Sequence, residues 1–414
     1  MIWIIWQSFL FGSLVAATNC HNNNQDDIPT RVHRILTKHP VVDGHNEFMS
    51  CVRILLNNKV TRVKFDHNLT VEEPWAAHPN FNQIDIPRMR AGQMGGQFWS
   101  AWVDCRSQYK DATQKYLEQI DLIHQVVAKY PDHLMWADSA DGIEAAWAAG
   151  KMASLIGVES GHAIGSSLPA LRSLYALGAR YMTLTHVCNT PWAVAAQVDE
   201  GSLPARAHGL TQFGRRVVHE MNRLGMMVDL SHVSVETMQQ AIQASLAPVI
   251  FSHSSARAVT DHVRNVPDIV LKMVAKNGGL VMVNLYSGFV KAGGINATVY
   301  DVVNHVNHIR AVAGVNHVGI GSNHNGGQET PLGMEDASKF PNLFAALIED
   351  GRFAWSDEDL GKLASGNLLR VMREVEAVRD VMAAGGVMAD NTWIPAADLG
   401  NDTACSTDYV TLDE

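Results

Sequence analysis

Short apolar runs alternate with longer amphipathic stretches along most of this chain. Eight runs have the length and bounding residues of buried strands: 40–47, 94–103, 153–161, 179–186, 225–232, 247–253, 278–286 and 317–323. Most of the stretches between them, such as 114–130 and 214–225, carry apolar residues at helical spacing. Apolar strands with helical crossovers predict a parallel sheet, and eight such units predict a closed α/β barrel of the (β/α)₈ TIM type.

Two segments depart from this alternation. Residues 50–93 form a long polar insertion after the first predicted strand, and the tail from about residue 375 shows no periodicity. We expect this irregular C-terminal tail to wrap the surface. The 414 residues are 47% hydrophobic, which is enough for a large core. The sequence therefore predicts a single barrel domain over residues 30–405.

The N-terminal stretch "MIWIIWQSFLFGSLVAATNC" is apolar and ends in small residues. This pattern predicts a secretory signal peptide over residues 1–17 and hence a secreted protein. Because the stretch lacks Lys or Arg at its start, a membrane anchor is the alternative. No other segment approaches the roughly 20 apolar residues of a spanning helix. The polar end "STDYVTLDE" has no hydrophobic tail of the kind a lipid anchor needs.

Charge, sequons and cysteines refine this picture. The net charge of -10, without a basic run, argues against nucleic acid as a partner. Three Asn-x-Ser/Thr sequons predict N-glycosylation, at Asn68, Asn296 and Asn401. An odd number of cysteines in an oxidising compartment predicts one free or intermolecular thiol. The five are Cys20, Cys51, Cys105, Cys188 and Cys405.

Candidate chemistry lies at the carboxyl ends of the predicted strands, where barrel enzymes place their active sites. A single histidine at such a position is most often structural. Here the strand ends carry a whole set of metal-binding or polar side chains: His45, Glu47, Glu159, His186, His232, His253 and Asn323. Their number favours a functional site over separate structural roles.

The spacing within this set predicts a metal centre. His45 and Glu47 are two residues apart, so on a strand both face the same side. His232 and His253 end the fifth and sixth predicted strands, and Glu159 ends the third, where it can bridge two metals. Imidazole and carboxylate ligands without thiolates suit catalytic zinc, and two zinc ions can activate a shared water.

Several motifs together resemble those of the membrane dipeptidase (renal dipeptidase) family of zinc peptidases. The resemblance runs from about residue 35 to 405. It is carried by "DGHN", "RAGQMGGQFWS", "SLIGVESGH", "TLTHVCNTPW", "VDLSHVS", "VIFSHSSA", "RNVPD" and "LVMVN". It implies a (β/α)₈ barrel with a two-zinc centre that cleaves dipeptides.

The resemblance also implies a role for each site residue. His45 and Glu47 would bind one zinc, His232 and His253 the other, and Glu159 both. His186 would contact the substrate near its carbonyl. Arg264, which alone would be taken for a surface ion pair, would hold the free carboxylate of the dipeptide through two parallel hydrogen bonds.

Cysteine roles follow from the same resemblance. It implies a disulfide between Cys105 and Cys188, both of which lie just beyond predicted strand ends. Cys405 matches a position that links two subunits in some relatives, which implies a disulfide-linked homodimer. Cys20 and Cys51 have no counterpart.

The first predicted strand departs from the family pattern. Glu47 stands where the family has Asp, and Met49-Ser50 stand where it has Pro-Trp. Glutamate keeps the charge but adds a methylene group. Metal sites tolerate only about 0.5 Å of misplacement, so we expect the first zinc to be held less well.

The last predicted strand departs more strongly. Its tip reads Asn323-His324-Asn325, where the family has Asp-aromatic-Asp. The first of those acids handles the proton that passes from water to the departing amine, and asparagine cannot carry it. Loss of a general acid or base typically costs about 10²–10⁴-fold in rate. We expect His324 to point away from the side of Asn323 and not to replace the acid.

Three functions are compatible with these observations. The first is a zinc dipeptidase with reduced activity. The second is a catalytically silent relative that binds metal or peptide or serves in protein interaction. The third, another barrel metallohydrolase acting on lactones or amides, is disfavoured because such enzymes usually carry His-x-His on the first strand. The sequence favours the first function. Turnover of a dipeptide is what distinguishes it from the second.

Overall fold

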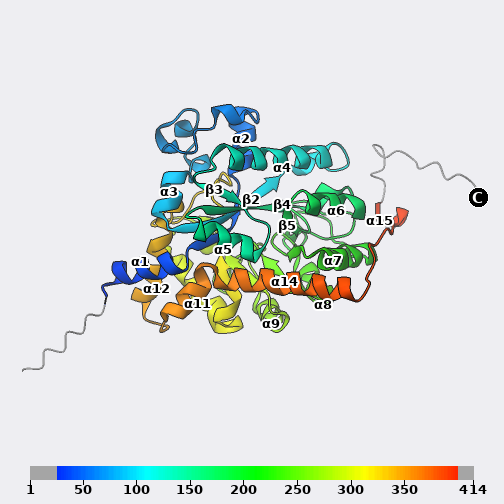
Figure 1. The fold of residues 1–414 in the computed structure, drawn as a ribbon. Helices are drawn as coiled ribbons and strands as arrows, with labels where there is room; N and C mark the ends of the chain where they lie inside the picture. Colours follow the sequence, from blue (N-terminus) through cyan, green and yellow to red (C-terminus); the bar gives the residue numbers. More distant parts are fainter. Residues whose placement is uncertain (1–25, 400–414) are drawn as a thin grey trace, which may run out of the picture.

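Eight parallel strands run side by side in a computed structural model that describes residues 26–399 (Figure 1). Their order around the sheet is β1-β2-β4-β5-β6-β7-β8-β9. Their bounds are β1 (Val41–Asn46), β2 (Met94–Trp102), β4 (Met152–Glu159), β5 (Ala179–Thr183), β6 (Met227–Asp229), β7 (Ile250–Phe251), β8 (Leu280–Val283) and β9 (Val318–Ile320). The last strand meets the first through a parallel bridge between Asn46 and His324. The predicted (β/α)₈ barrel is confirmed as a nearly closed barrel of the TIM type.

The strands are shorter than the apolar runs. β5 ends at Thr183, β6 at Asp229 and β7 at Phe251, so the histidines at 186, 232 and 253 lie in the loops that follow. Their placement inside the predicted strands was wrong. The backbone of His232 has a φ of 69°, a left-handed conformation that no strand contains.

A ninth strand, β3 (Leu134–Trp136), was not predicted. It pairs with the start of β4, on the edge whose later part pairs with β5. The strand order of the barrel is therefore unchanged. Three residues are too few for periodicity to reveal a strand.

Helices surround the barrel (Figure 1). Side-chain caps fix the start of several of them: Ser139, Ser167, Thr211 and Ser234 each accept a hydrogen bond from a backbone N–H of the first turn. The α-helices are α1 (Ile28–Lys38), α2 (Phe48–Leu56), α3 (Ile86–Ala91), α4 (Ala112–Lys129), α5 (Ala140–Ala148), α6 (Leu168–Ala176), α7 (Gln212–Leu224), α8 (Val235–Ala244), α9 (Asp268–Asn277), α10 (Ser287–Val290), α11 (Val299–Ala313), α12 (Phe340–Asp350), α13 (Asp357–Gly361), α14 (Asn367–Ala384) and α15 (Ala396–Leu399).

Helix α14 corrects the expectation of an irregular tail from residue 375. The helix continues to Ala384 and buries apolar side chains as far as Val375 and Met382. A buried cluster joins barrel residues such as Phe98 and Met282 to side chains of α14. The regular structure thus extends about ten residues further than the sequence pattern indicated.

The insertion at 50–93 is less polar than predicted. Between α2 and α3 it forms short 3-10 turns at Val60–Arg62, Leu69–Val71, Trp75–Ala77 and Pro79–Phe81. Its buried Phe65 and Trp75 pack with Phe48, with ring centroids 4.4 and 5.1 Å from that of Phe48. Both Phe48 and Phe65 also lie near the ring of Trp99 on β2, so the apolar side chains of the insertion extend the core of the barrel.

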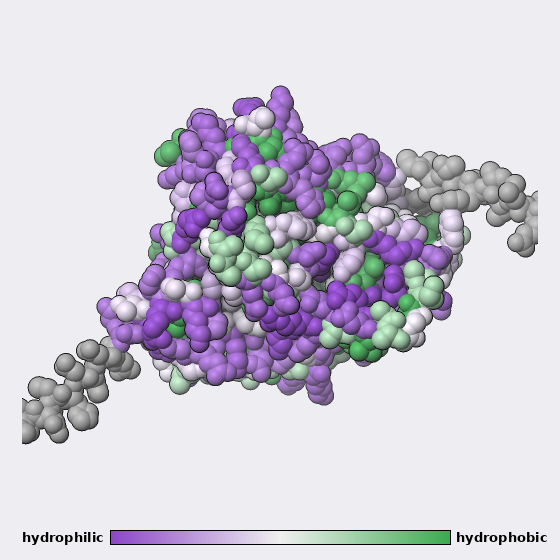
Figure 2. Space-filling model, viewed as in Figure 1, coloured by the Kyte–Doolittle hydropathy of each residue, from purple (hydrophilic) through white to green (hydrophobic). Residues whose placement is uncertain are grey.

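The face shown in Figure 2 is mainly hydrophilic, with hydrophobic residues in small groups. Among residues 26–399, no helix is long and apolar enough to cross a membrane. The predicted signal peptide 1–17, Cys20, Asn401 and Cys405 lie outside the described residues. Asn68 and Asn296, the other two predicted glycosylation sites, are both exposed.

Candidate metal centre

Glu159 lies at the centre of the polar cluster that the strand ends form. It ends β4, is 3% exposed and is surrounded by imidazoles from four other strand ends. Its Oε1 lies 3.0 Å from Nε2 of His232, 3.5 Å from Nε2 of His253 and 3.7 Å from Nε2 of His186. Its Oε2 lies 3.5 Å from Nε2 of His45. The two carboxylate oxygens thus face different histidines, as a bridging ligand requires.

Glu47 joins this cluster from the residue after β1. Its Oε1 lies 3.1 Å from Nε2 of His45, and its Oε2 accepts a 2.6 Å hydrogen bond from the Ser50 hydroxyl. Because β1 ends at Asn46, Glu47 occupies the N-cap position of α2 rather than a strand position. The prediction that Glu47 lies on the first strand was therefore wrong, although its side chain does contact that of His45.

Tyr181 orients the ring of His45. The Tyr181 hydroxyl donates to the carbonyl of Gly44 (3.1 Å), so it can accept from Nδ1–H of His45 (2.9 Å). This leaves the lone pair of His45 Nε2 directed at the carboxylates. Gly157 makes the contact feasible, since a Cβ on it would lie only 1.9 Å from the Tyr181 ring.

Ser252 and Asp229 orient His253 in the same way. The Ser252 hydroxyl donates to Asp229 (2.6 Å) and lies 2.7 Å from Nδ1 of His253. With the proton on Nδ1, the lone pair of Nε2 faces the centre. The motif "VDLSH" that supplies Asp229 resembles "VDGHN" on β1, where buried Asp43 accepts from the Ser322 hydroxyl and backbone N–H.

These supporting residues were not found from the sequence. An Asp shortly before a strand-end His in both motifs was the available signal for Asp43 and Asp229. Tyr116, whose hydroxyl donates to the carbonyl of Glu159 (2.6 Å), offered no such signal. Tyr181, on β5, and Ser252, which follows β7, likewise offered no such signal.

The imidazoles suit a metal ion. Nε2 of His232 and Nε2 of His253 lie 2.9 Å apart, and the buried Nδ1 of His232 has no hydrogen-bond partner. Burial, together with the nearby charge of Arg264, holds the pKa of both rings well below the usual range. The two rings are therefore neutral, which is the form that binds metals.

The pKa values of Glu159 and His45 are shifted upward instead. Burial and the charge of Glu47 raise the pKa of Glu159 to about 8. Burial opposes the charging of His45, but the two carboxylates outweigh it and raise its pKa to about 10. Two carboxylates packed this closely need a cation between them, and a divalent metal is a better one than a shared proton.

The ligand atoms fall into two groups that share Glu159. One group is His45, Glu159 and His253, and the other is Glu159, His186 and His232. In each, one ligand atom per residue lies within 4.8 Å of the others. The sequence instead paired His45 with Glu47, and His232 with His253. His232 and His253 thus fall in different groups, and Glu159 belongs to both.

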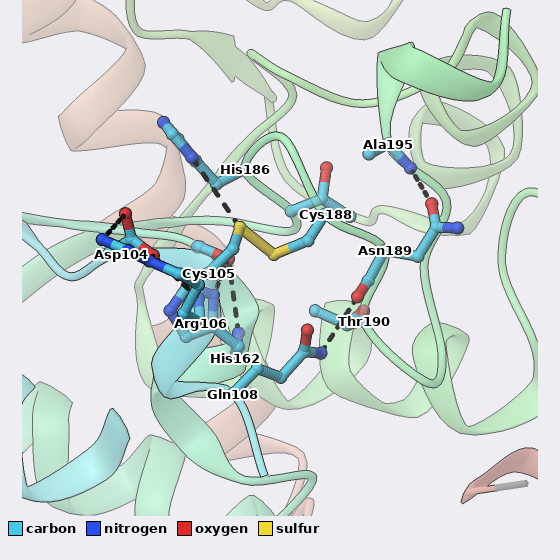
Figure 3. The surroundings of a disulfide bond; sticks show 12 residues. Asp104, Cys105, Arg106, Gln108, His162, His186, Cys188, Asn189, Thr190 and Ala195 are labelled. Atoms are coloured by element: carbon cyan, nitrogen blue, oxygen red, sulfur yellow. Dashed lines mark hydrogen bonds and ion pairs between the residues drawn. A yellow bond between two sulfur atoms is a disulfide. The ribbon is translucent and has the colours of Figure 1, made fainter. Parts of the chain in front are cut away.

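The expected disulfide between Cys105 and Cys188 is present, and it joins the loops after β2 and β5. Figure 3 shows it beside His186, whose Nδ1 is 4.0 Å from the Cys105 sulfur. Gln108 adds a hydrogen bond to the carbonyl of Asn189 (2.9 Å) between the same loops. These links restrain the loop that carries His186. Cys51 is a free, buried cysteine.

A cavity of about 440 Å³ opens above the cluster. Arg264 lies in its wall, 3% exposed, where its Nη2 donates to Nε2 of His253 (2.9 Å) and its buried Nε has no partner. His262 and Phe289, neither of which the sequence singled out, also line the cavity, with ring centroids 4.4 Å apart. The volume suits a small ligand, and the free Arg264 donor suits an anionic group on it.

The two amides at the tip of β9 differ in their surroundings. Both line the cavity, but the side-chain amide of Asn323 donates only weakly to Gln328 (3.4 Å). Asn325 is 1% exposed, and its amide donates to the carbonyl of Phe81 (2.5 Å) in the insertion. His324 points elsewhere, as predicted: it is fully buried, and its ring packs near Phe340. It therefore cannot serve in place of the missing acid.

The chain is similar to known proteins of one family. Residues 29–385 fit the family model of the membrane dipeptidases (peptidase family M19). The chain belongs to this family. Dipeptidase 3 of Rattus norvegicus is 45% identical over 341 residues, which are 82% of this chain and 66% of that protein. This chain thus spans just under two thirds of the length of that relative.

Solved structures agree on the fold. The crystal structure of the dipeptidase AC, a metallopeptidase of family M19, is 26% identical, with a TM-score of 0.70 over 81% of this chain and 98% of that one. A metallopeptidase from Rhodobacter sphaeroides, liganded with a phosphinate mimic of the dipeptide L-Ala-D-Ala, also gives a TM-score of 0.70. It is 24% identical and covers 81% and 99% of the two chains, so it supports the fold alone.

Proposed function

We propose that this protein hydrolyses dipeptides at a centre of two zinc ions. One observation carries the proposal: the carboxylate of Glu159 lies within 3.0–3.7 Å of imidazole nitrogens from four strand ends, below a cavity. Membership of the membrane dipeptidase family supports the reaction, and imidazole–carboxylate ligation supports zinc. The second zinc, beside Glu47, is the less firmly held one.

The proposed ligands are His45, Glu47, Glu159, His232 and His253. Zinc bound there would supply an activated water and polarise the scissile carbonyl. Arg264 would hold the substrate carboxylate with the Nε donor that the protein leaves unpaired. The Cys105–Cys188 disulfide would keep His186 beside the substrate carbonyl.

Proton transfer is the weak step of this mechanism. Asn323 stands in the cavity wall where the family has an acid, and an amide cannot take a proton from water and pass it to the departing amine. This observation favours the second candidate function, a catalytically silent relative that binds metal or peptide or serves in protein interaction. The two candidates differ in whether a dipeptide is turned over.

A single assay separates them. The purified chain is supplied with zinc and a dipeptide, and release of free amino acids is followed alongside metal content by elemental analysis. Zinc near one or two per chain together with hydrolysis supports the dipeptidase. Zinc without hydrolysis supports a silent relative that binds metal, and a chain prepared without chelators that contains no zinc contradicts the zinc centre.

We also propose a secreted, glycosylated homodimer linked through Cys405. The exposed sequons at Asn68 and Asn296 support glycosylation, and the odd cysteine count supports an intermolecular bond. Non-reducing gels should show a dimer that disappears on reduction and in Cys405→Ser. A dimer that survives in that variant would show that packing or another cysteine is responsible.

A further inference from the structure

Ser50 and Glu47 contact each other across the first turn of α2. Both side chains are buried, at 5% and 7% exposure, and both line the cavity. The Ser50 hydroxyl donates to Oε2 of Glu47 at 2.6 Å, a length typical of a hydrogen bond to an ionised carboxylate. Oε1 of Glu47 is turned the other way, toward Nε2 of His45 (3.1 Å).

We propose that Ser50 is a positioning residue for Glu47 as a metal ligand. Glutamate has one more rotatable bond than the aspartate of the family, and that freedom must be lost when the carboxylate binds an ion. The hydrogen bond from the Ser50 hydroxyl to Oε2 already restrains this rotation before an ion binds, and it leaves Oε1 directed at the centre. Residues 47 and 50 both depart from the family pattern, and the structure shows their new side chains in contact.

The contact is not needed to hold the helix. The backbone carbonyl of Glu47 accepts from the N–H groups of Ser50 (3.0 Å) and Cys51 (3.3 Å), and these bonds do not involve the hydroxyl. The side chain of Glu47 makes no capping bond to the backbone. Removal of the Ser50 hydroxyl should therefore loosen the orientation of the Glu47 carboxylate and leave α2 in place.

The inference rests on the proposed zinc centre, and its test measures zinc affinity rather than turnover. The full chain and its Ser50→Ala and Ser50→Thr variants are titrated with a chelator of known affinity, and both zinc-binding steps are fitted. We expect Ser50→Ala to weaken one step by about 10- to 100-fold, the usual effect of removing a partner of a metal ligand. Ser50→Thr keeps the hydroxyl and should retain most of the affinity.

Two controls separate this role from a general effect on structure. Ser365→Ala removes another buried hydroxyl, one that has no partner and does not line the cavity, and should change neither step. In a Glu47→Asp background, Ser50→Ala should lose most of its effect, because the shorter carboxylate is drawn away from the hydroxyl. Cobalt(II) in place of zinc gives a second readout, with the visible spectrum of one bound ion altered by Ser50→Ala.

The outcomes distinguish this inference from the proposed function. Ser50→Ala with native affinity at both steps overturns the inference, as does a full effect that persists in the Glu47→Asp background. A chain that shows the Ser50 effect but hydrolyses no dipeptide supports the inference and contradicts the proposed hydrolysis. A chain that binds no zinc overturns both.

Discussion

The two sides of the centre follow the family pattern to different extents. The β6–β7 side, formed by His232 and His253, keeps the motifs of the family, and Glu159 joins it to the other side. The β1–β9 side, formed by His45, Glu47 and the tip 323–325, carries the three exchanges Glu47, Asn323 and Asn325. The difference teaches that one side of a shared centre can change while the ligands on the other side, and the Glu159 that joins them, persist.

Loss of the shared ligand should have the largest effect, because it breaks both sides at once. Glu159→Gln keeps the volume but removes the bridging charge. We expect zinc content to fall below one per chain and dipeptide hydrolysis to fall by at least about a thousandfold, since metal catalysis supplies several kcal/mol. Elemental analysis and the dipeptide assay measure the two effects.

Glu236→Gln is the matched control, since it changes an exposed glutamate of α8 and should alter neither quantity. If Glu159→Gln retained two zinc ions, Glu159 would not be the link between the two sides.

Returning positions 323 and 47 of the β1–β9 side to the aspartates of the family should have the next largest effect. Asn323→Asp with Glu47→Asp should raise dipeptide hydrolysis by at least about a hundredfold, the low end of a general acid or base effect. Asn323→Asp alone should give most of the gain. Steady-state kinetics at saturating zinc measure it.

If the unchanged chain already hydrolyses dipeptides rapidly and the double reversion barely changes that rate, another group must transfer the proton. The comparison between the two sides would then fail, and the amides at the tip would be tolerated substitutions. Asn323→Ala should give no gain, which separates an added acid from an altered cavity shape.

The two amides of the tip should respond to different extents to the same exchange. Asn325→Asp replaces the donor to the carbonyl of Phe81 with a carboxylate oxygen in a buried position. We expect the free energy of unfolding to fall by about 1–3 kcal/mol, the penalty for an unpaired buried polar group. Asn323→Asp, in the cavity wall, should cost much less, and urea unfolding of both variants compares them. Equal losses would show that both amides have the same structural role.

The smallest predicted effect is a difference in zinc affinity between the two sides. Because Glu47 is longer than the family's aspartate, we expect the zinc beside it to leave first, with an affinity lower by about tenfold, or about 1.4 kcal/mol. Stepwise chelation should reduce the zinc content from two per chain to one before the second ion leaves. Simultaneous loss of both ions would show that the sides bind as one unit.

The barrel and its polar strand ends could be predicted from the sequence. Parallel strands joined by helices bring their carboxyl ends to the same edge of the barrel, and this does not depend on the conformation of the loops. The clustering of Glu159 with four histidines is confirmed on that basis. The short β3 was missed because three residues show no period. The continuation of α14 to Ala384 was missed although Val375, Val378 and Met382 repeat at helical spacing.

The sequence by itself determined which side chains stand at the strand ends and that an amide replaces an acid at position 323. Only the tertiary structure decided which nitrogen of each imidazole faces the centre, since that depends on partners such as Tyr181, which lies 136 residues from His45. It also decided that the buried Asn325, unlike Asn323, ties the tip to Phe81, 244 residues away. The physical reason is that side-chain orientation depends on contacts between segments distant in the chain, which no local periodicity records.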